Sequence, residues 1–129
     1  KGPSGRWKKE GLELASTLQR ITGGTLLVKG PVDLISSRSP PSLSKHVEIE
    51  TEAGPLYRRY NLTGVPAMSV GGTGDVLCGI CGGLMSRGMS SFDASCVASY
   101  VNGKAGEEAF SGIGHSLSAS SLHQSLRFQ

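Results

Sequence analysis

Residues 61–77, NLTGVPAMSVGGTGDVL, carry the strongest structural signal in this sequence. The glycine-rich turn 71–74 stands directly before an apolar, glycine-spaced segment, which predicts a helix that begins at Asp75. Its predicted buried face carries Val76, Leu77, Ile80 and Leu84. Glycines at a helix start expose successive backbone N–H groups, and the helix dipole adds positive potential there. The turn therefore predicts a phosphate site cradled by the N–H groups of Gly72, Thr73 and Gly74.

Asp75 lies in the first turn of this predicted helix, where two interpretations compete. A carboxylate there can simply stabilise the helix start. It can also act chemically on whatever the N–H groups hold. The glycine run is neither a Walker loop nor a dinucleotide fingerprint, so the segment by itself leaves both interpretations open.

The first third of the chain has the rhythm of an α/β protein. Residues 7–21 predict a helix whose apolar face carries Leu14, Ala15, Leu18 and Ile21. A glycine pair then precedes the apolar run 25–28, which reads as a buried strand. This order predicts a parallel sheet flanked by helices, with Lys29 at the carboxyl end of a strand, where open α/β sheets bind ligands.

Later segments predict a hairpin and three helices. Residues 47–51 alternate apolar and polar side chains, and Gly54-Pro55 turns the chain toward an antiparallel return strand over 56–60. Beyond the glycine-rich helix, Ser91 is expected to cap a helix that runs to about Phe110, and Ser118 a short final helix.

Composition narrows the location and the partners. The chain has 129 residues, which fits one domain. Its three cysteines are an odd, irregularly spaced set, which favours reduced thiols in the cytoplasm, and Cys78-x-x-Cys81 lacks the second pair of a zinc site. The net charge of +3 is scattered, aromatic residues are few, and no apolar run could span a bilayer, so we expect neither a nucleic-acid nor a membrane partner.

The glycine run resembles a known motif. Gly-Gly-Thr-Gly-Asp before an apolar helix is similar to the anion-hole motif of ribokinase-like kinases, in which the Asp takes a proton from the acceptor hydroxyl. The residues ahead of it make the segment resemble the ADP-dependent NAD(P)H-hydrate dehydratase branch; they are Asn61, Thr63, Gly64, Pro66 and Met68.

Three further stretches resemble the same branch, in family order. Residues 28–33 resemble its nucleotide-contacting Lys-Gly loop, 91–94 and 100–106 its next helix, and 116–122 its closing segment. Together they cover most of residues 24–126. Departures are Ala67 and Val70, where many members have glycine and a small or hydroxyl residue, and a longer loop over 36–55.

The resemblance implies a fold, a reaction and a site. The fold would be ribokinase-like, with a Rossmann-like parallel central sheet. The reaction would dehydrate NADHX or NADPHX to NAD(P)H while ADP, or ATP, is split, with Mg²⁺ carried by the nucleotide and no protein metal cage. Asp75 would be the catalytic base and contact NAD(P)HX, and Gly72, Thr73 and Gly74 the anion hole. The nucleotide would contact Lys29, Gly30, Pro31, Val32, Asp33, Asn61 and Gly74.

The resemblance also implies that residues 1–129 form a single partial domain, the C-terminal, nucleotide-binding half. The family domain needs about as much chain again before residue 1, in the same or another chain. We expect a homo-oligomer, and an isolated fragment less active than the whole domain. Two alternatives remain: a hydroxyethylthiazole kinase-like small-molecule kinase, and a non-catalytic module that binds nucleotide or another chain.

Overall fold

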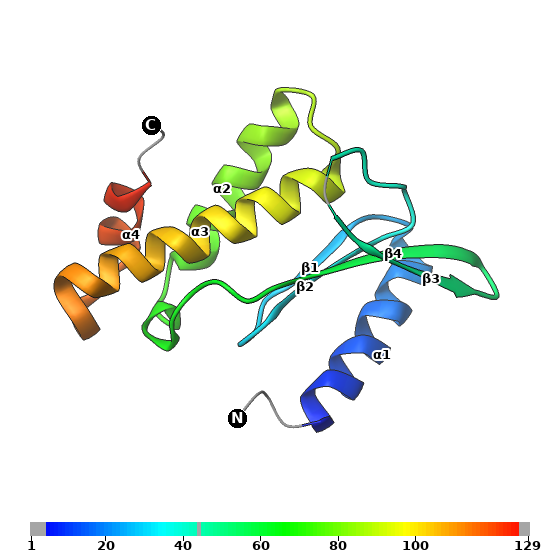
Figure 1. Ribbon diagram of the computed structural model, residues 1–129, viewed down its shortest axis with the longest axis horizontal. Helices are drawn as coiled ribbons and strands as arrows, with labels where there is room; N and C mark the ends of the chain where they lie inside the picture. Colours follow the sequence, from blue (N-terminus) through cyan, green and yellow to red (C-terminus); the bar gives the residue numbers. More distant parts are fainter. Residues whose placement is uncertain (1–4, 44, 127–129) are drawn as a thin grey trace.

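The computed structural model describes residues 5–43 and 45–126, whose arrangement is shown in Figure 1. In chain order the elements are α1 (Gly5–Thr22), β1 (Leu26–Val28), β2 (Asp33–Ser37), β3 (Val47–Thr51), β4 (Gly54–Asn61), a 3-10 turn (Pro66–Met68), α2 (Thr73–Ser86), α3 (Ser91–Ile113), a second 3-10 turn (Gly114–Ser116) and α4 (Ala119–Ser125). Helix α2 thus begins two residues earlier than predicted. Within the described residues, no helix is both long and apolar enough to cross a membrane.

Helix starts follow local side-chain chemistry. Ser90, one residue before the predicted cap, accepts the backbone N–H of Asp93 at 3.1 Å and caps α3. Ser118 caps α4 as predicted, in a reciprocal capping box with Ser121. Both caps use a hydroxyl oxygen to satisfy an N–H group that has no partner inside its own helix.

The sheet has four strands in the order β1-β2-β4-β3, and every described pairing is antiparallel. The β3–β4 hairpin is confirmed, but its turn lies at residues 52–53 rather than at Gly54-Pro55, which already belong to β4 and pair with Thr51 and Glu50. The expected parallel arrangement is wrong for these strands. The physical reason lies in the connections: residues 29–32 join β1 to β2, and a tight turn joins β3 to β4. Parallel neighbours need a crossover of a dozen or more residues, which these loops cannot supply.

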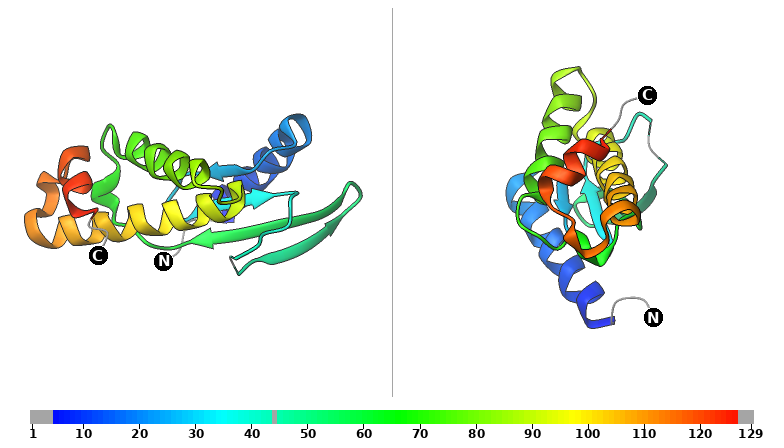
Figure 2. Two further views of the ribbon diagram at one scale, coloured as in Figure 1. Left: turned by 90° about the horizontal axis from the view of Figure 1, so that it is seen from above. Right: turned by 90° about the vertical axis from the view of Figure 1, so that its left-hand side faces the viewer.

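Strand β2 lies inside the molecule, with α1 on one side of the sheet and α3 on the other (Figure 2). Because successive side chains of a strand point to opposite faces, Ile35 meets Phe92 and Cys96 of α3, where the core forms. Ser36 points the other way and donates to Gln19 Oε1 of α1 at 2.9 Å. All five residues of β2 are buried.

Of the face predicted to be buried on α1, only Ala15 is buried. Ala15 and Gln19 lie against the sheet, with Gln19 only 1% exposed, whereas Leu14 and Ile21 are 56% and 74% exposed. Leu18 is also exposed. The polar contact between Gln19 and Ser36 selects the buried side, and it leaves the apolar stripe of α1 facing outward.

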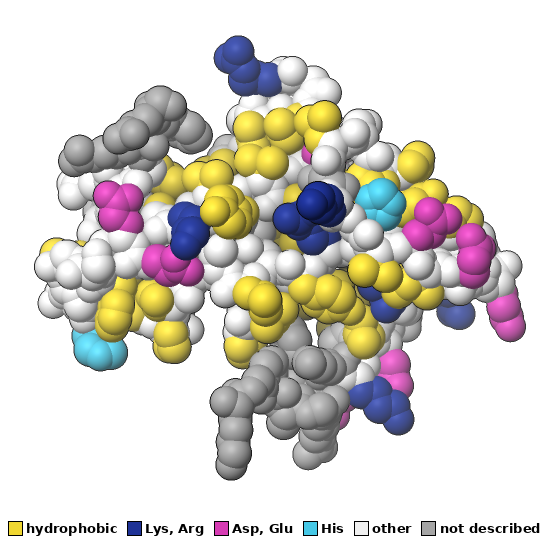
Figure 3. Space-filling model, viewed as in Figure 1, with side chains coloured by type: hydrophobic (Ala, Val, Ile, Leu, Met, Phe, Trp, Pro, Cys, Tyr) yellow, Lys and Arg dark blue, Asp and Glu magenta, His cyan; other side chains and the backbone are white. Residues whose placement is uncertain are grey.

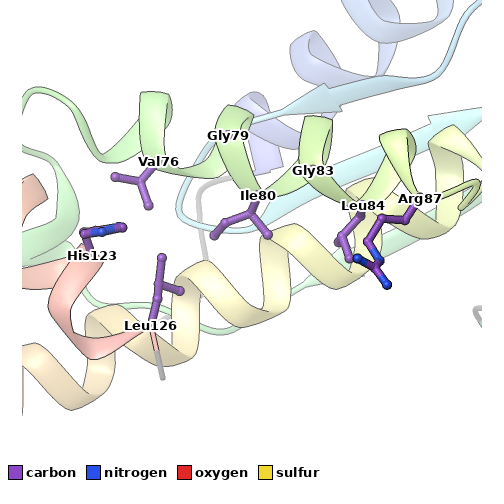
Figure 4. Close-up of a pocket in the computed structure, with 8 residues that line it drawn as sticks. All are labelled: Val76, Gly79, Ile80, Gly83, Leu84, Arg87, His123 and Leu126. Atoms are coloured by element: carbon purple, nitrogen blue, oxygen red, sulfur yellow. The ribbon is translucent and has the colours of Figure 1, made fainter. Parts of the chain in front are cut away.

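Helix α2 also keeps apolar surface uncovered. Of its predicted buried face only Leu77 is fully buried, while Val76, Ile80 and Leu84 line a groove of about 770 Å³ between α2 and the C-terminal segment that carries Leu126 (Figure 4). Space-filling shows hydrophobic side chains at the surface over α2 and α3 (Figure 3). Within the described residues, α1 and α2 therefore each present an apolar surface that no other element covers.

Candidate functional site

The first candidate cluster lies where β2 begins and β4 ends. The antiparallel register places Asp33 directly opposite Asn61, both on the face that α3 covers. Ser99 of α3 donates its hydroxyl to Asp33 Oδ2 at 2.6 Å, and the Asn61 side-chain amide donates to the same oxygen at 3.4 Å and to the Ser99 carbonyl at 3.2 Å. These three side chains, all buried, are called the Asp33 cluster below.

The predicted Lys-Gly loop closes onto this cluster. The Gly30 N–H donates to Asp33 Oδ1 at 3.2 Å, and Lys29 Nζ lies 3.3 Å from each carboxylate oxygen. Pro31 and Val32 complete the turn at the surface of the sheet edge. Within the predicted nucleotide set, Lys29, Gly30 and Pro31 are exposed, whereas the Asp33 and Asn61 side chains are occupied by bonds inside the protein.

Asn61 also connects β4 to the glycine-rich segment. Its Oδ1 accepts the Thr63 hydroxyl at 2.9 Å, and the same hydroxyl lies 3.2 Å from the Tyr100 carbonyl of α3. Gly103 makes this close approach feasible, because a Cβ there would lie 2.7 Å from the backbone carbonyl atoms of Thr63. The chain is thus pinned to α3 at the point where it enters the glycine-rich segment.

One turn farther along α3, Glu107 holds the next residue of this segment. Its Oε1 accepts the Gly64 N–H at 2.9 Å, and its Oε2 accepts Lys104 Nζ at 2.7 Å. The Lys104 hydrogen bond, followed by the Gly64 one, lowers the pKa of Glu107 below its ordinary 4.5. The hydrogen bond to Glu107 in turn raises the pKa of Lys104.

Protonation of Glu107 should therefore release Gly64. A carboxyl whose pKa is lowered by folding contributes stability above its unfolded pKa and loses it as the pH falls through the folded value. We expect the Gly64 amide resonance to titrate with a midpoint below 4.5, and Glu107→Gln to abolish that transition. The neighbouring, exposed Glu108 offers the control, because Glu108→Gln should leave it in place. A Gly64 amide resonance that still titrates in the Glu107→Gln variant would contradict this contact.

The second candidate cluster is the start of α2. Gly72 is the N-cap, with a φ of 88° in the left-handed region that favours glycine. Because glycine has no side chain, this N-cap residue supplies no side-chain capping bond to α2. The Thr73 hydroxyl donates to the Met68 and Val70 carbonyls at 2.9 and 3.1 Å, which fixes the preceding loop. A Cβ on Gly74 would meet nothing within 4 Å. The first turn of α2 therefore offers backbone N–H groups beside open space, the arrangement that binds anions.

Asp75 is exposed at the third position of α2 and is not the N-cap. Asp93 holds the same position in α3, but its carboxylate is buried and accepts the Ser90 hydroxyl at 2.6 Å and the Ser42 N–H at 3.0 Å. The two aspartates share one helix-dipole environment and differ in their partners. Asp93 has the contacts of a structural carboxylate, and Asp75 faces outward beside the open N–H groups.

The structure brings the predicted residues together as two clusters rather than one. The Lys-Gly loop and Asn61 lie at the Asp33 cluster, and residues 72–75 lie at the start of α2. Among the described residues, segment 62–72 connects the two clusters and is hydrogen-bonded to α3 near its beginning. Sequence reasoning missed Ser99 and Glu107 as site residues. A usable signal was present for Ser99, because Ser95 and Ser99 lie one turn apart on the side of α3 that also carries Phe92 and Cys96, and a hydroxyl buried there needs a partner.

Asn102 adds a buried polar group next to this region. Its side chain is 1% exposed, and within the described chain neither the amide nitrogen nor the amide oxygen has a hydrogen-bond partner. A buried unpaired polar group costs about 1–3 kcal/mol. Water, a ligand or further protein would remove this cost.

Comparison with known proteins places this geometry in context. A family model described as NAD(P)H-hydrate dehydratase matches residues 3–127. The chain is 40% identical over 98 residues to an ADP-dependent (S)-NAD(P)H-hydrate dehydratase of Cenarchaeum symbiosum, an alignment that covers 74% of this chain and 28% of the relative.

Two archaeal proteins called bifunctional NAD(P)H-hydrate repair enzyme Nnr are also similar. Identity is 39% over 99 residues with that of Methanospirillum hungatei, covering 77% of this chain and 17% of the relative. It is 37% over 119 residues with that of Hyperthermus butylicus, covering 92% and 19%. The chain thus spans less than a third of the length of each of these relatives.

Proposed function

Because the chain belongs to the NAD(P)H-hydrate dehydratase family, we propose that the whole protein dehydrates NADHX and NADPHX to NAD(P)H, with ADP split to AMP and phosphate. One observation carries this proposal: an exposed aspartate, Asp75, stands beside the uncapped N-terminus of α2. Relatives named ADP-dependent (S)-NAD(P)H-hydrate dehydratase support ADP as the co-substrate.

In this reaction the hydroxyl of the hydrated nicotinamide ring attacks the terminal phosphorus of ADP. Asp75 orients that hydroxyl and takes its proton, and the bond from phosphorus to the bridging oxygen breaks to release AMP. The N–H groups of Gly72, Thr73 and Gly74 stabilise the charge on the transferred phosphoryl group. The C–O bond to the phosphorylated oxygen then breaks, phosphate leaves, and the neighbouring ring carbon loses a proton to water or to the departing phosphate, so that the ring double bond forms again. Positioning and charge stabilisation supply most of the catalysis in such a transfer.

The nucleotide itself would lie between the two clusters. Lys29 can meet a phosphate because its side chain is about half exposed, and the Gly30–Pro31 turn is at the surface. Magnesium would enter with the nucleotide and be held chiefly by its phosphates, because Mg²⁺ is usually bound through substrate phosphates rather than by a dedicated protein cage.

The rest of the domain would complete the fold. The relatives contain far more chain than this one, and α1 and α2 leave their apolar stripe and groove uncovered. We propose that residues supplied by the same or another chain cover these surfaces and add the parallel central sheet of a ribokinase-like domain. The whole protein is proposed to work in the cytoplasm as a homo-oligomer. Light scattering, which measures the molar mass in solution, would test the oligomeric state.

The direct test is turnover by the full-length protein. Incubation of hydrated NADH with ADP and magnesium should restore NADH absorbance and release AMP in equal amounts. Hydroxyethylthiazole, offered with ATP, serves as the control substrate for the kinase alternative. Thiazole phosphate formed without any recovery of NADH would reject the dehydratase, and nucleotide binding without turnover on either substrate would favour a non-catalytic module.

A further inference from the structure

The four donors that meet the Asp33 carboxylate differ in strength and exposure. Ser99 and Asn61 donate from inside the protein, and the 2.6 Å bond from Ser99 has the length of a charge-assisted O–H···O⁻ bond. Lys29 is 45% exposed, and its 3.3 Å separations from the carboxylate are long for an ammonium donor. The carboxylate is therefore held firmly from α3 and only loosely by the lysine.

The remaining donor, the Gly30 N–H, makes the carboxylate a brace for the loop. Asp33 Oδ1 accepts this N–H at 3.2 Å, three residues back along the chain. The conformation of the turn 29–32 thus depends on the orientation of the Asp33 side chain. Ser99 fixes that orientation although it lies 66 residues away in the sequence and is itself buried.

We infer that the Asp33 cluster positions the Lys29–Gly30 loop for the diphosphate of a nucleotide, with Ser99 as a positioning residue on α3. The inference rests on the nucleotide site of the proposed function. Asp33 and Asn61 then serve the nucleotide without touching it. Lys29 is free to exchange its weak contact with Asp33 for a phosphate, while Ser99 and Asn61 keep the carboxylate in place.

Loss of the Ser99 hydroxyl should reorient Asp33. Without its shortest donor, the carboxylate can turn toward Lys29, which holds the ammonium group away from phosphate and loosens the Gly30 contact. The start of α2 is fixed separately, through the Thr73 hydroxyl. The change should therefore weaken nucleotide binding and leave turnover at saturating nucleotide nearly unchanged.

The test uses the full-length protein and Mg–ADP. We expect Ser99→Ala to raise the Kd for ADP about three- to tenfold, the usual worth of one hydrogen bond, with kcat at saturating ADP within twofold of wild type. Hydrogen exchange of the Gly30 amide should accelerate. Ser111→Ala is the matched control on the same helix, because that exposed hydroxyl donates to the Glu108 carbonyl of its own helix at 2.7 Å and lies far from the Asp33 cluster in the sequence.

A double-mutant cycle with Lys29→Ala separates positioning from a merely structural role. If Ser99 acts through Lys29, its effect on ADP affinity should shrink in the Lys29→Ala background. A lowered melting temperature with an unchanged Kd, or full additivity in the cycle, would overturn the inference. Should Ser99→Ala fail to fold, Asp33→Asn tests the same brace with a side chain of equal size.

Failure of the proposed function gives a different result. If wild-type protein neither binds ADP nor restores NADH, the proposed function is rejected, whereas Gly30 exchange still reports whether Ser99 braces the loop without nucleotide. If wild type binds ADP and Ser99→Ala leaves both Kd and Gly30 exchange unchanged, the brace alone is rejected.

Discussion

Asp75→Asn should lower turnover of the full-length protein by about 10² to 10⁴-fold while ADP affinity stays within a few-fold of wild type. The N–H groups of the cradle belong to the backbone and stay in place after the substitution. The loss of a negative charge near the phosphates does not weaken ADP binding, because it removes a repulsion. A fall in kcat without a fall in affinity is typical of an interaction made mainly in the transition state. Calorimetric ADP binding and single-turnover kinetics measure the two quantities.

Asp93→Asn provides the matched control for this prediction. Asp93 has the same helix position as Asp75 but is buried and bonded to Ser90 and Ser42. Its loss should lower the melting temperature and leave single-turnover rates nearly unchanged. If Asp75→Asn gives that same pattern, a lower melting temperature with near-normal turnover, Asp75 is a helix-stabilising residue and the proposed mechanism is wrong.

Gly103→Ala should have the largest effect on stability, with a loss of about 1–3 kcal/mol in the free energy of unfolding. The new Cβ would overlap the Thr63 hydroxyl and lie 2.7 Å from the Thr63 backbone, whose N–H donates to Asn61 Oδ1 at 3.4 Å. Backbone cannot rotate away as a side chain can, so the glycine-rich segment must shift. Denaturant unfolding of the full-length protein measures the change.

Gly112→Ala on the same helix separates this clash from the general effect of a glycine. A Cβ at Gly112 meets nothing within 4 Å, and alanine is the better helix former, so the variant should gain about 0.5–1 kcal/mol. Equal gains at Gly103 and Gly112 would show that α3 does not contact Thr63 as closely as the structure has it.

Local signals in the sequence were enough for most elements and for one half of the site. The alternating run 47–51 and the Gly54-Pro55 signal predict the β3–β4 hairpin, because side-chain period and turn chemistry act over a few residues, although the turn itself lies two residues earlier, at 52–53. The glycine run predicts the exposed N–H groups at the start of α2, because capping and helix dipole are also local. The roles of the predicted residues in binding and catalysis stay predictions, and they rest on the resemblance.

Tertiary structure decided what depends on residues distant in the chain. The periodicity of the sequence predicts that Leu14, Leu18 and Ile21 of α1 are buried, but all three are exposed. Periodicity contains no information on the hydrogen bond between Gln19 and Ser36, which lies between α1 and the sheet. Asp33, Asn61 and Ser99 lie on three elements, and no local signal in the sequence predicts that their side chains meet. Only the antiparallel register of β2 with β4, and the packing of α3 above them, brings the three side chains together, since a buried carboxylate is stable only where folding supplies its donors.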